Sequence, residues 1–231
     1  RSLREGEPSR VPETLWCYRL DRRRIVTGRA LSNAGNAVAW LRETLRLPPA
    51  LETEAALAAL EPDAHGLTVL PLLLGERAPG WERWDGASLA GLTQATRPVE
   101  ILRAWLEAVA YGIAGPLDAL REALGGEVEV IASGGALHAS SVWAGILADV
   151  LGCRVTLAAE REASSRGAAL VALERLGVVA DLADAPVPEG TEYAPDPARH
   201  RRYRVARERQ RRVEEALAAL APHPAGADGG E

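Results

Sequence analysis

The sequence predicts an α/β fold in which an N-terminal hairpin is followed by parallel βαβα units of a mixed sheet. Residues 14–20 and 24–31 are rich in β-branched and aromatic side chains and flank a polar turn at residues 21–23, which is typical of a hairpin. Residues 128–176 then alternate strand, turn and helix twice. That order requires parallel strand pairing with a right-handed crossover.

Two short helices are predicted after the hairpin. Ser32 and Asn33 form a candidate N-cap, because the residues after them are apolar at helical spacing. Thr53 is the candidate cap of a second, alanine-rich helix, which ends before Pro62.

An apolar strand, a loop and one long helix come next. Residues 67–74 are almost wholly apolar, which is typical of a central strand covered on both faces, although Pro71 removes one hydrogen-bond donor. Residues 75–86 contain Gly, Pro and two Trp without periodicity, which favours a functional loop. Apolar residues at steps of three or four then predict a helix over 96–124.

In residues 128–177, where strands and helices alternate, each predicted helix is followed by a glycine, Gly152 or Gly177. The predicted elements are a strand at 128–132, a turn at Ser133-Gly134-Gly135, a helix at 139–151, a stop at Gly152, a strand at 154–157 and a helix at 163–176. The small residues Gly167, Ala168 and Ala169 are interpreted as allowing the last helix to pack closely on the sheet.

The C-terminal part is predicted to be a proline-rich connection, 181–198, an amphipathic helix, 199–220, and a disordered tail, 221–231. Residues 199–212 hold eight arginines and one glutamate, so a nucleic-acid-binding arm is one alternative. The helix is favoured, because apolar residues form one stripe that leaves the arginines to solvent: Tyr203, Ala206, Val213, Leu217 and Leu220.

Composition excludes several classes of chemistry. All 27 cationic residues are arginine and the net charge is −5, so Schiff-base lysines and the P-loop lysine are impossible within this sequence. Cys17 and Cys153 lack metal or redox spacing and the four histidines form no pair, so no metal site is expected. No apolar run reaches the ~18 residues of a membrane span. We therefore expect a soluble, cytoplasmic protein that binds neither membrane nor nucleic acid.

The strand, double glycine and helix at residues 128–151 form the strongest local feature. Glycines at such a turn let a ligand approach the backbone with no Cβ in the way. Many α/β proteins carry glycines there for structural reasons alone. The spacing in residues 133–138 also differs from the G-x-G-x-x-G fingerprint, which disfavours a dinucleotide-binding fold.

Five motifs in this order resemble the C-terminal half of the FGGY carbohydrate kinases. They are LPLLLGERAPGW, GASLAGLT, LRAWLEAVAYGI, ASGGALHASSVWAGILADVLG and EREASSRGAALVAL. The upstream stretch LWCYRLDRRRIVTGRALSNAGNAVAWL looks most like the gluconate and xylulose kinase branch. The resemblance covers about residues 14–217, with 14–180 as its principal domain.

The resemblance implies an actin-like, ribonuclease-H-like ATPase domain that uses ATP and Mg²⁺ to phosphorylate a hydroxyl of a sugar or sugar acid. It places Gly134, Gly135 and Ala136 against the adenosine and Gly91 close to the phosphates. Ala139 matches a position that offers a polar group to the adenine in some members. Alanine cannot hydrogen-bond, so its contact with the base would be steric.

The resemblance also implies that essential parts lie outside this chain. The catalytic aspartate, the first phosphate loop and most sugar contacts belong to a missing N-terminal kinase domain, so no catalytic residue is assigned here and the isolated chain is expected to be inactive. Residues 1–13 are interpreted as a remnant that follows the phosphate loop. Residues 1–4 are expected to form a short strand, or else the sheet has a gap there. A non-catalytic subunit that completes a split kinase is a further alternative, and a homodimer is a further expectation.

Overall fold

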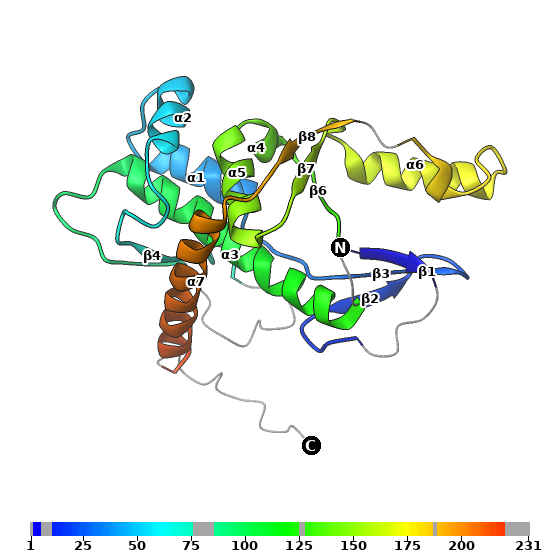
Figure 1. Cartoon of the computed structure of the whole chain (residues 1–231), viewed down its shortest axis with the longest axis horizontal. Helices are drawn as coiled ribbons and strands as arrows, with labels where there is room; N and C mark the ends of the chain where they lie inside the picture. The colour runs from blue at the N-terminus through cyan, green and yellow to red at the C-terminus, as the bar shows by residue number, and fades with distance from the viewer. Residues whose placement is uncertain (1, 6–10, 76–85, 125–127, 187–188, 220–231) are drawn as a thin grey trace, which may run out of the picture.

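The structure of the chain, a computed structural model, describes residues 2–5, 11–75, 86–124, 128–186 and 189–219 (Figure 1). The long helix α3 (Pro98–Leu124) lies at the centre, and the other elements surround it. Most of its apolar stripe is buried, as the spacing predicts: Leu102, Trp105, Leu106, Val109, Leu117 and Leu120.

The predicted hairpin is confirmed. Strand β2 (Trp16–Arg19) pairs antiparallel with β3 (Arg24–Gly28). Asp21 closes the turn, because its Oδ1 accepts hydrogen bonds from the backbone N–H groups of Arg23, at 2.7 Å, and Arg24, at 2.8 Å.

A short N-terminal strand, β1 (Ser2–Glu5), pairs antiparallel with the other edge of β3, which agrees with the first of the two expectations for this end of the chain. The described strands nevertheless form three separate sheets, with orders β1-β3-β2, β4-β5 and β6-β7-β8.

Helix α1 (Gly35–Thr44) is not capped as predicted. Its N-cap is Ala34, and no side chain accepts a hydrogen bond from its first turn. Asn33 instead clamps residues 74–75, since its Nδ2 donates to Gly75 O at 2.8 Å and its Oδ1 accepts from Leu74 N at 3.0 Å. The Ser32–Asn33 cap is wrong because this long-range contact uses both polar atoms of the Asn33 amide.

The cap predicted at Thr53 is also wrong. Helix α2 (Ala50–Ala58) begins three residues before Thr53 and has Pro49 as its N-cap, so Thr53 lies inside the helix. The buried Thr53 Oγ1 donates to Pro48 O at 2.8 Å, which fastens the start of the helix from within.

The apolar segment 67–74 forms only a three-residue strand, β4 (Thr68–Leu70), which pairs antiparallel with β5 (Ser88–Ala90). It is buried as predicted, but by α3 and α7 rather than as the centre of a large sheet. Pro71 follows it directly, and a proline cannot donate to a strand ladder. The predicted loop 75–86 lies outside the described residues except at its two ends.

Parallel pairing is confirmed between β6 (Val130–Ala132) and β7 (Val155–Ala158). The helix predicted at 139–151 is confirmed as α5 (Ser141–Leu151), and it is preceded by a separate single turn, α4 (Gly135–His138), that is not predicted from the sequence. Ser140 separates them, because its Oγ accepts from Trp143 N at 3.1 Å and so caps α5.

Helix α6 (Ala163–Arg175) has no buried residue. Gly167, Ala168 and Ala169 are exposed, and a Cβ built at Gly167 meets no atom within 4 Å. The interpretation that these small residues pack on the sheet is wrong, because all three are exposed. The helix instead meets the hairpin near its C-terminal end, where Glu174 forms an ion pair with Arg24 of β3.

The proline-rich connection contains a strand that the sequence analysis missed. Strand β8 (Gly190–Tyr193) pairs antiparallel with β7 after a short 3-10 turn, η1 (Leu182–Asp184). Helix α7 (Pro197–Ala218) starts two residues before the predicted point, because the Asp196 side chain accepts from two backbone N–H groups and caps it.

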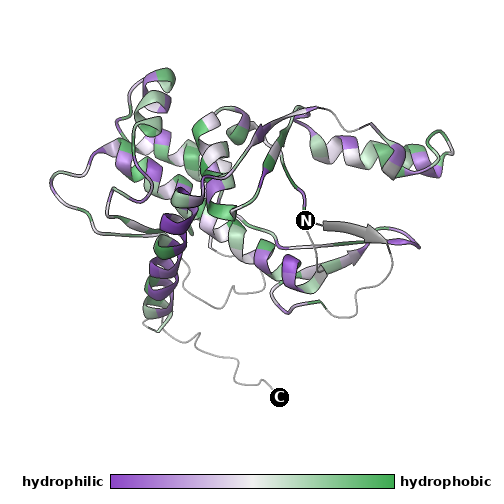
Figure 2. Cartoon of the chain, viewed as in Figure 1, coloured by the Kyte–Doolittle hydropathy of each residue, from purple (hydrophilic) through white to green (hydrophobic). Residues whose placement is uncertain are grey.

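The described part of α7 agrees with the predicted amphipathic pattern. Tyr203 and Ala206 are buried, Val213 and Leu217 are half-buried, and Leu220 and the tail 221–231 lie outside the described residues. Figure 2 shows mostly hydrophilic residues along the lower part of this helix. Within the described residues, every helix is too short or too polar to cross a membrane.

A buried ion pair joins α3 to its neighbours. Arg103 and Glu107, one turn apart on α3, are 4% and 1% exposed, and Arg103 Nε donates to Glu107 Oε1 at 2.7 Å. Arg103 also donates to Leu57 O of α2 at 2.7 Å and to the Tyr203 hydroxyl of α7 at 2.9 Å. Burial raises the pKa of Glu107, but hydrogen bonds from His65 and Arg103 outweigh it and leave the pKa below its usual value.

We predict that Glu107→Gln lowers the free energy of unfolding by about 3–5 kcal/mol, because it leaves the Arg103 charge buried without its counter-ion. Urea denaturation measures this loss. Arg154→Gln, at an exposed pair with Glu192, is the control and should change the free energy by less than about 1 kcal/mol. Equal losses of unfolding free energy in the two variants would show that the buried pair contributes no more to stability than an exposed one.

Candidate functional site

The glycine turn, residues 133–136, joins the end of β6 to α4. Gly134 has φ 127° and ψ 144°, a conformation that is essentially restricted to glycine. Its carbonyl accepts a hydrogen bond from His138 N at 3.1 Å, which begins the single turn of α4. The sequence therefore uses Gly134 to turn the chain sharply at the carboxyl end of a parallel strand.

The backbone of the glycine turn lies open. A Cβ built at Gly134 or at Gly135 meets no atom within 4 Å, and both Gly135 and Ala139 are exposed. Protein side chains thus leave free the space beside the two glycines. This is the property that a backbone-recognition site for a flat ligand requires.

The start of α1 lies beside this turn. A Cβ built at Gly35 comes within 3.2 Å of the Ala136 Cβ, and α1 contacts α4. The sequence analysis did not single out Gly35. The available signal was a glycine at the first position of a helix, where it costs conformational entropy and so calls for a packing or functional reason.

No acidic side chain lies in the first turn of α1 or of α4, and neither N-cap residue has a side chain that accepts from the helix. At the start of α1, Asn36 Oδ1 accepts a hydrogen bond from Ala34 N at 2.9 Å. The first N–H groups of a helix carry a partial positive charge, and acidic side chains or bound anions stabilise them. The site therefore combines an open backbone with uncapped helix starts.

Gly91 lies apart from the glycine turn. It follows β5, has φ 92°, and a Cβ built on it would come within 2.5 Å of Gly66 O, at the start of β4. This close approach gives Gly91 a structural reason to be glycine. The four candidates Gly134, Gly135, Ala136 and Ala139 lie within a stretch of six residues, whereas no described contact joins Gly91 to them.

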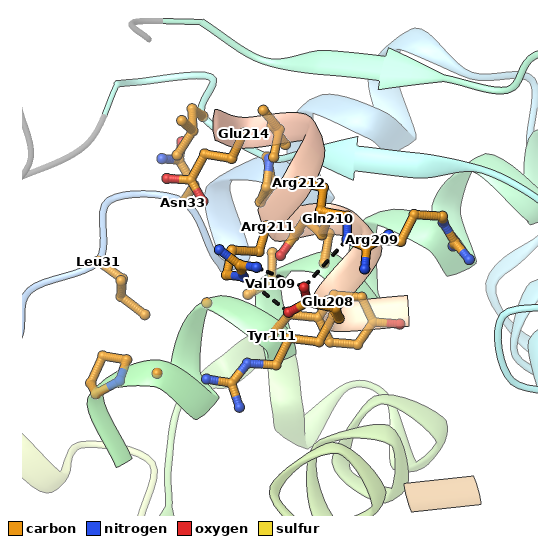
Figure 3. A pocket seen from close by; sticks show the side chains of 18 of the residues that line it. Leu31, Asn33, Val109, Tyr111, Glu208, Arg209, Gln210, Arg211, Arg212 and Glu214 are labelled. Carbon is orange, nitrogen blue, oxygen red and sulfur yellow. Dashed lines mark hydrogen bonds and ion pairs between the residues drawn. The ribbon is translucent and has the colours of Figure 1, made fainter. Parts of the chain in front are cut away.

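A second hollow, the α7 groove, has a volume of about 1200 Å³ and lies between α3, α7 and the segment before α1. Its floor is largely apolar, with Val109 and Leu70 among the contributors, and α7 supplies a charged wall. Figure 3 shows Glu208 on this wall with its ion pairs to Arg211 and Arg212. None of the predicted nucleotide-site residues lines the groove.

The arginine-rich segment is mostly paired within the protein. Hydrogen bonds from Arg211 lower the pKa of Glu208 to about 2. Six of the eight arginines face acidic side chains, in the pairs Arg199–Asp149, Arg202–Glu61, Arg207–Asp118, Arg209–Asp63, Arg211–Glu208 and Arg212–Glu208. These pairs give the arginines an internal role and weaken the case for a nucleic-acid-binding arm.

One cluster has the residue types of a metal site. Asp63, His65 and Glu107 bring ligand atoms within 4.8 Å of one another, although Glu107 is more than 40 residues from the other two in sequence. Both carboxylates are already engaged, Glu107 by Arg103 and Asp63 by Arg209. Leu67 N–H donates to His65 Nδ1 at 3.0 Å, so Nε2 carries the hydrogen that faces Glu107. The arrangement is an ion-pair network that a cation would have to break.

A family model described as the FGGY family of carbohydrate kinases, C-terminal domain, matches residues 18–174. A glycerol kinase of Rhodopirellula baltica is 32% identical over 179 residues, which is 78% of this chain and 33% of that protein. A glycerol kinase of Stenotrophomonas maltophilia is 37% identical over 140 residues, or 60% of this chain and 28% of that protein.

Solved structures are similar over most of the chain. The xylulose kinase of Rhodospirillum rubrum has 29% identity and a TM-score of 0.76, covering 90% of this chain and 43% of its own. The gluconate kinase of Lactobacillus acidophilus has 25% identity and a TM-score of 0.76, covering 92% and 44%. The predicted actin-like fold class is confirmed. The chain spans about a third of the curated relatives and less than half of the solved ones.

We predict opposite effects for alanine at the two glycines of the turn. Gly134→Ala should cost about 1–3 kcal/mol of unfolding free energy, because a Cβ is strained at its φ and ψ. Gly135→Ala should be neutral or stabilising by up to about 1 kcal/mol, since the position is helical and the space beside it is empty. Thermal unfolding of the two variants distinguishes them, and a large loss in Gly135→Ala would contradict the open turn.

Proposed function

The chain belongs to the FGGY family of carbohydrate kinases, and on that basis we propose that it is the nucleotide-binding part of an ATP-dependent kinase. The enzyme transfers the γ-phosphoryl group of ATP to a hydroxyl of a sugar or sugar acid, of gluconate or xylulose type. The observation that supports this proposal most is the open glycine turn at the end of β6, between uncapped helix starts.

In the proposed complex, the backbone of Gly134, Gly135 and Ala136 packs against the adenosine. Ala139 offers only a methyl group to the base, so selectivity for adenine rests on shape. Gly35 borders the same space, because it lies next to Ala136. Gly91 is proposed to lie near the phosphates, on the side of β5.

Phosphoryl transfer depends on positioning and charge stabilisation more than on covalent chemistry of the protein. The proposed contribution of this chain is therefore to hold the nucleotide with its terminal phosphate in one place. Mg²⁺ would neutralise charge on the phosphates. Among the described residues, the one cluster of possible ligands is already paired with arginines, so we assign no protein ligand to the ion.

The remaining parts of the enzyme are proposed to lie in the portion of the relatives that this chain does not match. That portion amounts to more than half of each solved kinase compared above. We propose that it supplies the general base, the first phosphate loop and the sugar contacts, and that the complete enzyme acts in the cytoplasm.

We predict that the chain binds ATP–Mg²⁺ and adenosine weakly, and that Gly135→Leu abolishes this binding. A leucine side chain fits the empty space of the free protein but occupies the position proposed for the ligand. Isothermal titration calorimetry of both ligands on parent and variant measures the effect.

The matched control is Gly112→Leu, because Gly112 is also exposed and has no atom within 4 Å of a built Cβ, but lies on α3 in the α7 groove, which no residue of the glycine turn lines. It should bind as the parent does. Folded parent protein that binds neither ligand would refute the proposed function, and binding that survives in Gly135→Leu would place the nucleotide elsewhere.

We also predict that the isolated chain does not phosphorylate gluconate, xylulose or glycerol. Loss of a general base alone lowers a rate by about 10²- to 10⁴-fold, and loss of the opposing half of the cleft adds to it. A coupled assay for ADP release measures this. Turnover well above the uncatalysed rate would show that this chain carries its own catalytic base.

A further inference from the structure

Glu54 on α2 holds the first turn of α5. Its Oε1 accepts a hydrogen bond from the backbone N–H of Val142 at 2.9 Å, and its Oε2 accepts from Ser140 Oγ at 2.9 Å. Ser141 Oγ donates to the same carboxylate at 3.3 Å. A carboxylate at this end of a helix is also favoured by the helix dipole.

This clamp acts directly next to the glycine turn. Ser140 follows Ala139, the last residue of the proposed nucleotide site, and Ser140 Oγ also accepts from Trp143 N. Trp143 Nε1 in turn donates to Leu106 O of α3 at 3.2 Å. The C-terminal end of the site is thus fastened through Glu54 to α2 and through Trp143 to α3.

The turn itself has few internal anchors. Helix α4 is four residues long, has no side-chain cap and contains no buried residue. Beyond its contact with α1 and the packing of the half-buried Ala136 and Leu137 on the core, such a segment takes its position from what holds its two ends, β6 on one side and the start of α5 on the other. The position of Glu54 therefore helps to set that of the turn.

Glu54 is itself held in place. Thr53, its neighbour on α2, is buried and bonded to Pro48 O, and Arg103 donates to Leu57 O one turn further along the helix. A carboxylate on a helix fixed in this way is an anchor rather than a mobile surface group.

We propose that Glu54 is a positioning residue for nucleotide binding, which keeps the glycine turn in its binding geometry by clamping the start of α5 to α2. The inference rests on the proposed function. Glu54 acts through Ser140 and Val142 and makes no contact with the nucleotide in this scheme. Nucleotide affinity thereby depends on a side chain that is about 80 residues away from the turn in sequence.

The test compares Glu54→Ala with Glu54→Gln by calorimetry with ADP–Mg²⁺ and with adenosine, at a temperature where all proteins are folded by circular dichroism. Glu54→Ala should weaken both affinities by about tenfold, within the range of typical site-to-site coupling. Glu54→Gln keeps an acceptor for Val142 N and should recover most of that loss. Hydrogen exchange of residues 133–143 should be faster in Glu54→Ala than in Glu54→Gln.

Two controls separate positioning from general stability. Glu52→Ala removes an exposed carboxylate from the same helix, and Asp196→Ala removes the cap of α7, away from the turn. Both should bind as the parent does. An equal loss in Asp196→Ala, or parent-like affinity in Glu54→Ala, would overturn the positioning role alone. A parent that binds neither probe would overturn the proposed function and this role with it, whatever the exchange rates.

Discussion

The buried pair of Arg103 and Glu107 is the interaction on which the arrangement of the helices depends. Two opposite charges in the interior are tolerable only when each is paired and its remaining hydrogen-bonding capacity is used. Here the Arg103 guanidinium donates hydrogen bonds to Leu57 O of α2 and to the Tyr203 hydroxyl of α7. The Glu107 carboxylate also accepts a hydrogen bond from His65. Helices that are distant in sequence are thereby fixed around α3, including α2, which carries Glu54.

This frame explains how a short turn with no fully buried residue is held in place at the proposed binding site. Parallel pairing of β6 with β7 fixes where the turn begins, and the packing of α5 on α3 fixes where it ends. Between these points the chain needs a glycine at position 134, because the backbone there has a positive φ. It needs a second glycine at position 135 to keep the space beside the backbone open. The ligand-facing part can then remain exposed, because its stability is supplied by the elements on either side.

The sequence predicted what depends on local pattern and missed what depends on contacts between distant residues. The hairpin, the stripe of α3 and the β6–turn–helix unit follow from residue spacing, and the structure has all three. Asn33 was taken for a helix cap because asparagine suits that role, but its partners lie about 40 residues further along. Strand β8 lies in a proline-rich segment without a local strand pattern. It is extended because it pairs with the edge of β7, which is a contact between distant residues. The Glu54 clamp gives no local signal at all.

Recognition through backbone has a consequence for how such a site can vary in sequence. At Gly134 and Gly135 the requirement is the absence of a side chain, whereas at Ala139 a polar contact to the base can be missing while the shape of the turn is kept. The residues that maintain this shape are then under a stricter constraint than some of those that would face the ligand. In the proposed scheme Ser140 must keep its hydrogen bonds to Glu54 and Trp143, because these contacts help to set the position of the turn. In the proposed site, binding therefore depends less on the side chains around the ligand than on the polar contacts immediately behind the turn.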